Sequence, residues 1–148
     1  MKCIISFLAV CLVLLCAFPC SAQAASGTDV DTEYLSDGGY IVTELANPNT
    51  RDAAQTKVKT YYNSDDVIEW KIILTGTFRY NGTVATCTGA TCDVEIYDSS
   101  WYVVSKTAYC ELATATCEVT MGKNVAGVNV VTPSFELSIT CIRYGVYV

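Results

Sequence analysis

Two acidic residues, Asp93 and Glu95, have the types and spacing that could perform acid–base chemistry. They alternate with Val94 and Ile96 in the stretch TCDVEIYD. Side chains two residues apart in a strand share a face, so the two Cα atoms would lie about 7 Å apart, in the range of the carboxylate pair of a glycoside hydrolase. Nothing nearby marks either carboxyl as a general acid. The solvated outer face of a strand is the preferred interpretation, and we predict no catalytic residue.

The chain contains no histidine, which excludes Ser-His-Asp and Cys-His catalysis and imidazole metal ligands. Zinc is disfavoured further because no CxxC motif occurs. Asp29, Asp31 and Glu33 imitate the start of an EF-hand loop, but Tyr34 occupies the position that requires glycine. We therefore predict no metal site and no cofactor.

The aromatic residues of the chain favour a binding function over a catalytic one. The chain holds 10 Tyr and 2 Trp, and amphipathic aromatic side chains are typical of surfaces that stack on carbohydrate or contact protein. Trp70 and Trp101 each begin an inward-facing alternation, which predicts core positions for both. The candidates for a binding surface are tyrosines, several of which the alternation leaves off the core face: Tyr61, Tyr62, Tyr97, Tyr102 and Tyr109.

The N-terminal residues have the pattern of a secretory signal peptide, residues 1–24. One lysine at position 2 precedes an apolar run over residues 3–18, and Ala22-Gln23-Ala24 forms a cleavage site. The run of about 16 residues is shorter than the roughly 20 needed to span a membrane, which disfavours an anchor. We expect a secreted, extracellular protein in a compartment that permits disulfides.

The remaining 148 − 24 = 124 residues suit one domain with its own core. They carry 8 basic and 15 acidic residues, so their formal charge is 8 − 15 = −7. This balance argues against a nucleic-acid partner, and no later segment suits a membrane. We expect an exposed acidic lead-in over residues 25–36 and one domain over residues 37–148, with a loop near residues 46–55.

Short alternating runs rich in β-branched and aromatic residues predict an all-β protein. A single β-sandwich, Ig-like, of about eight or nine antiparallel strands fits this pattern, with a barrel as the alternative. The expected strands are residues 40–45, 56–62, 67–80, 83–87, 91–97, 101–109, 112–120, 125–131 and 134–141.

One hairpin has a clear signal, because Asn81-Gly82 is typical of a two-residue type I′ turn. Apolar side chains alternate from Trp70 to Tyr80 before it. A two-residue loop would place Gly76 opposite Cys87, so we expect Cys87 to point into the core.

The same alternation places Cys92, Cys117 and Cys141 on apolar faces and Cys110 near a turn. Together with Cys87 they make five cysteines after the leader, so at least one thiol is free or pairs between chains.

A set of positions between residues 37 and 145 forms a further pattern. Its most specific features are Gly76-Thr77-Phe78 with Tyr80 and Gly82, then Cys87, Ser100-Trp101 and Thr140-Cys141. This pattern resembles that of a group of small secreted proteins of unknown function from clostridial, gut-dwelling Gram-positive bacteria, and the resemblance implies secretion and a sandwich-like β-domain.

Cys87 and Cys141 match the pair of cysteines of that group, and both lie on apolar faces. We therefore predict a Cys87–Cys141 disulfide. A possible second disulfide joins Cys92 to Cys110 or to Cys117, and Cys117 is preferred because it shares the inward orientation. Cys92, Cys110 and Cys117 all depart from the group's pattern.

These features predict a secreted, non-catalytic binding or adhesion module for an extracellular glycan or protein. The alternative is a secreted effector such as an inhibitor or antibacterial factor, and a small glycoside hydrolase is less favoured. A contiguous exposed tyrosine patch would favour binding, whereas a concave cleft holding Asp93 and Glu95 would favour the enzyme.

Overall fold

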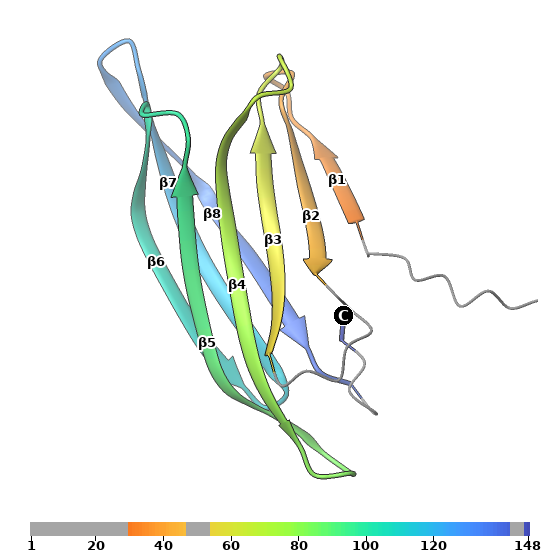
Figure 1. The fold of residues 1–148 in the computed structure, drawn as a ribbon. Coiled ribbons are helices and arrows are strands. Elements are labelled where there is room, and N and C mark those ends of the chain that lie inside the picture. Colours follow the sequence, from red (N-terminus) through yellow and green to blue (C-terminus); the bar gives the residue numbers. More distant parts are fainter. Residues whose placement is uncertain (1–29, 47–53, 143–146) are drawn as a thin grey trace, which may run out of the picture.

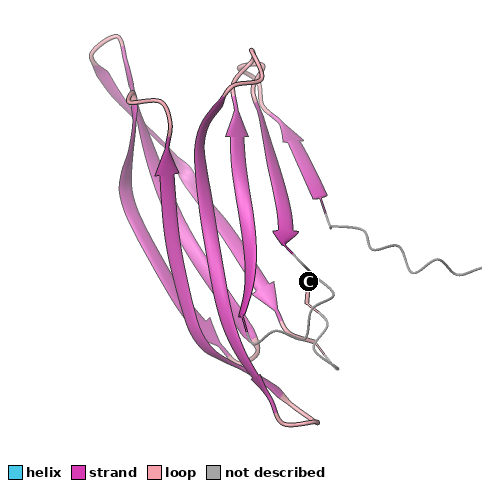
Figure 2. Ribbon diagram, viewed as in Figure 1, coloured by secondary structure: helices cyan, strands magenta, loops and turns pink. Residues whose placement is uncertain are grey.

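The computed structural model describes residues 30–46, 54–142 and 147–148, and the predicted signal peptide lies outside this part of the chain. The described residues form strands, turns and loops, with no helix among them (Figure 2). Accordingly, none of these residues belongs to a helix that could cross a membrane. The predicted all-β structure is confirmed.

Two antiparallel sheets pack face to face as a β-sandwich that is not closed into a barrel (Figure 1). Consecutive strands pair throughout, so each sheet is a meander. Sheet A contains, in order, β1 (Val30–Tyr34), β2 (Tyr40–Ala46), β3 (Ala54–Tyr62), β4 (Ile68–Tyr80) and β5 (Ala85–Ile96). Sheet B contains β6 (Trp101–Glu111), β7 (Thr114–Val125) and β8 (Val128–Thr140).

The structure corrects three strand predictions. The stretch expected to be an acidic lead-in contains β1, whose residues are all exposed but pair with β2 along the whole strand. The strands expected at residues 83–87 and 91–97 form the single strand β5. Those expected at 125–131 and 134–141 likewise form β8, which passes through Pro133 at a bulge. An edge strand tolerates proline at such a position because its ladder is already interrupted.

A bulge also explains why β5 is continuous. Phe78 pairs with Cys87, whereas Thr77 pairs with Gly89, so Thr88 is an extra residue of β5 without a partner on β4. A bulge reverses the alternation of side chains along the strand. Cys87 and Cys92 are five positions apart, yet both therefore face the core.

The predicted two-residue loop at Asn81-Gly82 is wrong. Four residues, 81–84, join β4 to β5, and Tyr80 pairs with Ala85. The side chain of Asn81 causes the wider turn, because its Oδ1 accepts two backbone N–H groups within the loop, at 3.0 and 2.8 Å. Cys87 pairs with Phe78 and not with Gly76, the partner expected for a two-residue loop. This difference of two residues keeps the side chain on the same face, so Cys87 points inward as predicted.

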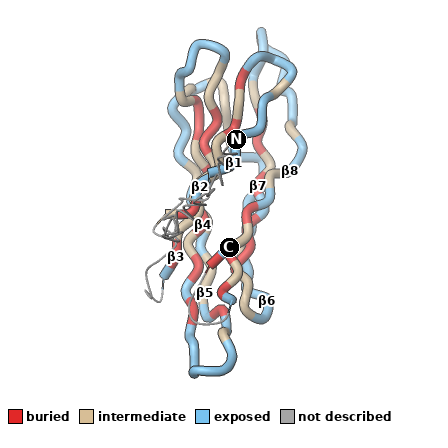
Figure 3. The backbone as a smooth tube through the Cα atoms, turned by 90° about the vertical axis from the view of Figure 1, so that its right-hand side faces the viewer, coloured by how far each residue is buried: buried red, intermediate tan, exposed pale blue. Residues whose placement is uncertain are grey.

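The core lies between the two sheets. Trp70, Ile72 and Leu74 of β4 and Val119 and Met121 of β7 are each at most 1% exposed. Figure 3 shows buried residues along strands of both layers. The inward alternation predicted from Trp70 is confirmed for this part of β4.

The two sides of the sandwich differ. On one side β5 and β6 lie next to each other (Figure 1), and the N–H of Cys87 donates to the carbonyl oxygen of Leu112 at 2.7 Å. On the other side β8 faces β3 and β4. Because sheet A has two more strands than sheet B, β1 and β2 extend beyond β8 and leave that side open.

The predicted Cys87–Cys141 disulfide is wrong: Cys87 is bonded to Cys110, with a Cα–Cα distance of 5.5 Å. Alternation places Cys87 inward correctly but cannot show which strand lies beside it. Cys110 is on β6, the strand next to β5, whereas Cys141 follows β8 and is a free, buried thiol. The disulfide closes the β5–β6 side at the end away from the loop that joins these two strands.

Cys92 and Cys117 are also free thiols, so the possible second disulfide is not formed in this structure. The two thiols nonetheless lie close enough between the sheets for each to affect the pKa of the other. Burial, together with the neighbouring Cys92 sulfur, raises the pKa of Cys117 to about 12. The inward orientation predicted for both residues is confirmed.

Candidate functional site

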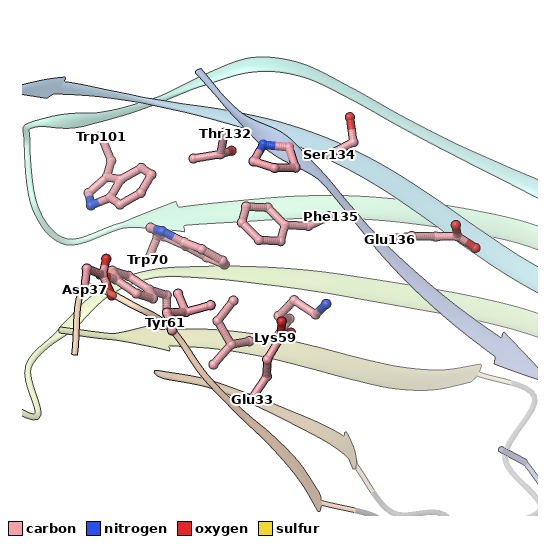
Figure 4. Close-up of a pocket in the computed structure, with 13 residues that line it drawn as sticks. Glu33, Asp37, Lys59, Tyr61, Trp70, Trp101, Thr132, Ser134, Phe135 and Glu136 are labelled. Atoms are coloured by element: carbon pink, nitrogen blue, oxygen red, sulfur yellow. The ribbon is translucent and has the colours of Figure 1, made fainter. Parts of the chain in front are cut away.

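A groove of about 410 Å³ occupies the open side of the sandwich. One wall is β8, from Thr132 to Glu136, and the other comes from β1, β3 and the turn before β2 (Figure 4). The groove exists because sheet A continues past the last strand of sheet B. A groove of this size falls within the range of small-ligand sites.

Four aromatic rings form the floor of the groove. Tyr61 stacks on Trp70 with ring centroids 5.4 Å apart, and Phe135 lies 5.0 Å from Trp70. Trp101 meets both Tyr61 and Trp70 edge to face, at 5.6 and 6.0 Å. Tyr61 and Trp70 are buried, whereas Trp101 and Phe135 are half-buried and present ring surface to the groove.

Glu69 holds Trp101 in this arrangement. Its Oε2 accepts a hydrogen bond from Trp101 Nε1 at 2.6 Å and from Lys123 Nζ at 2.9 Å, while Oε1 accepts from Asn63 Nδ2 at 3.2 Å. Burial opposes ionisation of Glu69, but these three donors outweigh it and lower its pKa. Lys123 also lies 4.9 Å from the ring centroid of Trp101.

Asp37 anchors the end of the groove near the β1–β2 turn. Its Oδ2 accepts from the hydroxyl of Tyr61 at 3.2 Å, and its Oδ1 accepts from the N–H of Gly39 at 3.0 Å. Burial, reinforced by Asp37, raises the pKa of Tyr61 to about 12. The Tyr61 hydroxyl is therefore neutral at physiological pH and acts as a donor. Gly39 is required here because a Cβ would lie 2.8 Å from that hydroxyl.

Lys59 places an ammonium group over the floor. Its Nζ lies 5.7 Å from the ring centroid of Phe135. Within the described part of the chain, the one salt bridge is Lys123–Glu69, so Lys59 has no ion-pair partner there. Glu33, on β1, lines the same groove and is exposed. The groove therefore offers an ammonium donor and carboxylate acceptors beside aromatic rings.

Trp70 carries a further donor. Its indole N–H is buried and has no acceptor among the described residues. An unsatisfied buried donor costs about 1–3 kcal/mol, which is unusual in a native structure. Trp70 is one of the residues that line the groove, so this buried donor lies beside the candidate site.

The structure does not bring the five candidate tyrosines together. Tyr61 lies in the groove floor and is buried rather than exposed. Tyr97 and Tyr109 are exposed on other surfaces, where their hydroxyls donate to Glu95 and Glu118. Tyr102 lies over Gly122, on the outer face of sheet B.

Tyr62 belongs instead to a row of three tyrosines on the outer face of sheet A. Tyr40 stacks on Tyr62 at 4.8 Å with an interplanar angle of 7°, and Tyr34 follows at 5.9 Å. This tyrosine row is contiguous, but the stacked rings turn their faces toward each other. Little ring surface remains for a ligand except on Tyr34, which is 79% exposed.

Asp93 and Glu95 lie on the exposed outer face of sheet A, opposite Ile73 and Lys71. Neither residue lines the groove. Within the described residues no cluster of three potential metal ligands occurs. Of the EF-hand-like residues, Asp29 lies outside the described part, while Asp31 and Glu33 are on β1.

Comparison of the chain with models of protein families, with curated proteins and with solved structures found no match in any of the three. The site must therefore be interpreted from its own residues.

The alternation of β3 contained a signal for this site. In the stretch KVKTYY, Lys57 and Lys59 share a face with Tyr61, and a charged side chain on the inner face of a strand indicates that this part of the sandwich is open. Trp101 was predicted to be core and instead lines the groove while half-buried. Glu69 could not be found in this way, because a bulge between β3 and β4 turns it inward.

Proposed function

We propose that the protein is a secreted, non-catalytic binding module, and that its ligand, a glycan or a segment of an extracellular protein, binds in the groove. The observation that carries this proposal is the aromatic floor, flanked on the sheet A wall by Lys59, Glu33 and Asp37. Rings that provide flat apolar contact, flanked by a few polar groups that fix orientation, are the usual composition of a ligand site.

The same residues support binding better than catalysis. The groove contains no thiol, and the Tyr61 hydroxyl is held neutral by its raised pKa. Glu136 is the acidic residue of the β8 wall, but it pairs with Glu118 on the outer face of sheet B. Its carboxylate extends away from the aromatic cluster (Figure 4), so it does not face Glu33 as an acid–base pair would.

Secretion is part of this proposal. The leader pattern of residues 1–24 and the resemblance to small secreted clostridial proteins both favour it. The Cys87–Cys110 disulfide is compatible with an extracellular location, because such bonds persist in oxidising compartments.

Binding can be tested with the oxidised protein that begins at Ala25, applied to an array of glycans and an array of extracellular peptides. We expect at least one class of ligand to be captured, and Lys59→Met to abolish or strongly weaken that capture. Lys71→Met is the matched control, because Lys71 makes a similar cation–π contact, with Tyr97, on the opposite face of sheet A. Equal capture by both variants, or no capture on either array, would contradict the proposal.

A further inference from the structure

The donors and acceptors of the groove indicate what kind of molecule it binds. We infer that the ligand is an uncharged glycan, an inference that rests on the binding function proposed above. A sugar hydroxyl both donates and accepts hydrogen bonds, and the C–H face of a sugar ring packs on aromatic rings. The groove provides each of these contacts within one site.

The floor favours a ligand with both apolar and oxygen-bearing surface. Trp101 and Phe135 present half-buried rings, while the N–H of Trp70 behind them has no acceptor among the described residues. A purely apolar ligand would leave this donor unsatisfied. A hydroxyl oxygen that enters when the ring of Phe135 moves aside would accept from it and recover the cost of the buried donor.

The walls supply polar groups of both kinds. Lys59 is a donor without an ion-pair partner in the described part of the chain, and Glu33 is an exposed acceptor on the same wall. Thr132 Oγ1 donates to the carbonyl oxygen of Met121 at 3.0 Å, so its lone pairs are available to accept. Hydroxyl groups, which can pair with either kind of partner, fit this mixture better than a ligand that only donates or only accepts.

The charges of the groove disfavour ionic ligands. Glu33, Asp37 and Glu136 contribute three negative charges against one positive charge on Lys59, a balance of 1 − 3 = −2, and the whole chain has a formal charge of −6. Sulfated or uronic glycans would be repelled. A cationic ligand would compete with Lys59, which already occupies the position over the Phe135 ring.

The strand edges beside the groove disfavour an extended peptide. Strand addition needs a regular row of free backbone N–H and C=O groups. The edge of β8 is interrupted by the bulge at Pro133, where an N–H is missing. The edge of β1 is only five residues long and carries Asp31 and Glu33, which are features that prevent edge pairing.

Intrinsic fluorescence tests this inference directly, because the chain has 2 Trp and both line the groove. The oxidised protein should be titrated with uncharged hexose and N-acetylhexosamine oligosaccharides, with sulfated and uronic oligosaccharides, and with neutral and lysine-rich peptides. We expect a saturable change only with uncharged glycans, and an affinity that changes little between low and high salt.

Two variants locate the contact. Glu33→Gln and Lys59→Met should each weaken glycan binding about tenfold, because each removes a hydrogen bond to a charged group. Glu44→Gln, on the outer face of neighbouring β2, is the control and should bind as the unmodified protein does.

The possible results separate the inference from the proposed function. Binding of a peptide that depends on Glu33 and Lys59 would overturn the glycan assignment and leave a binding groove in place. A salt-sensitive preference for anionic glycans would also overturn it. If no glycan changes the fluorescence, the inference is wrong. A glycan that binds equally well to both groove variants would refute the groove itself.

Discussion

Trp101 and Glu69 connect the two sheets of the sandwich at the end of the groove. Nε1 of Trp101, on β6, donates to Oε2 of Glu69, on β4, at 2.6 Å. Glu69 is only 6% exposed and also accepts from Lys123 of β7. A bulge in sheet A and two strands of sheet B thus determine together where the Trp101 ring lies, and the shape of the groove depends on this contact.

The first prediction concerns the stability that Glu69 provides. Glu69→Gln leaves the Lys123 ammonium without its partner and weakens the hydrogen bond from Trp101. We expect the free energy of unfolding in urea to fall by about 2 kcal/mol. Glu44→Gln, at an exposed site, should change it by less than about 0.5 kcal/mol. Equal stabilities of the two variants would show that Glu69 does not connect the sheets.

The second prediction is the pH dependence of this contact. The pKa of Glu69 is lowered in the folded protein, from a usual value of 4.5. Its stabilisation is therefore fully present above about pH 5 and is lost as the pH falls through the folded pKa. The difference in unfolding free energy between the unmodified protein and Glu69→Gln should shrink below about pH 4.5. If this difference in unfolding free energy stays constant down to the pH at which the protein unfolds in acid, Glu69 does not stabilise the fold through its ionised carboxylate.

The third prediction concerns the crosslink. Peptide mapping of the unreduced protein should find Cys87 joined to Cys110 and Cys141 unpaired. Because the bond closes a loop with a sequence separation of 23 residues, replacing both cysteines by serine should lower stability by about 3 kcal/mol. A peptide that joins Cys87 to Cys141 would restore the pairing that the sequence predicts and refute this arrangement of β5 and β6.

The fourth prediction concerns the thiols of the core. Burial raises the pKa of Cys92 and Cys141, and it raises that of Cys117 to about 12. Alkylation requires the thiolate, so at about pH 8 all three should resist iodoacetamide in the folded protein and react once it is unfolded. Mass spectrometry counts the modified sites. Rapid modification of Cys117 in the folded protein, or a Cys92–Cys117 crosslink, would contradict the structure.

The fifth prediction concerns the turn between β7 and β8. Val125 pairs with Val128, so Ala126 and Gly127 form a two-residue turn, and Ala126 has a φ of 51°. Asparagine tolerates this left-handed conformation better than alanine does. Ala126→Asn should raise the unfolding free energy by about 0.5–1 kcal/mol.

Ala113→Asn is the control for this turn. Ala113 lies in the two-residue turn between β6 and β7, where Leu112, not Ala113, has a positive φ of 52°. No gain in stability is expected there. A loss with Ala126→Asn, or an equal gain at both positions, would refute the role of the left-handed conformation.

The sequence was sufficient for properties that depend on alternation. The all-β class, the sandwich and the inward orientation of Cys87 and Cys92 all follow from which side chains share a face. Alternation along a strand contains no information about which strand lies beside it across the sandwich, and the predicted Cys87–Cys141 pairing was wrong for this reason. The turns show a related limit. Asn81-Gly82 belongs to a four-residue loop, because the hydrogen bonds that the Asn81 side chain accepts outweigh the local preference for a two-residue turn. Ala126-Gly127 forms a two-residue turn instead.

The candidate site was predictable only in part. The sequence identified aromatic residues as the binding material, and Tyr61 among them lies in the groove. It did not identify Phe135 or Glu33 as site residues. The groove forms because sheet A has more strands than sheet B, and this depends on the strand order. Glu69 was hidden by a bulge that reverses the face on which its side chain lies.

The central claim is that the groove, and not the tyrosine row of Tyr34, Tyr40 and Tyr62, is the ligand site. Backbone amide NMR of the isotope-labelled protein, titrated with the tightest uncharged glycan from the array, tests it most directly. We expect the shifted amides to gather along Thr132–Glu136 of β8 and around Lys59, with the indole N–H signals of Trp70 and Trp101 shifting at the same ligand concentration. Shifts centred on the tyrosine row, with unchanged indole signals, would contradict the account.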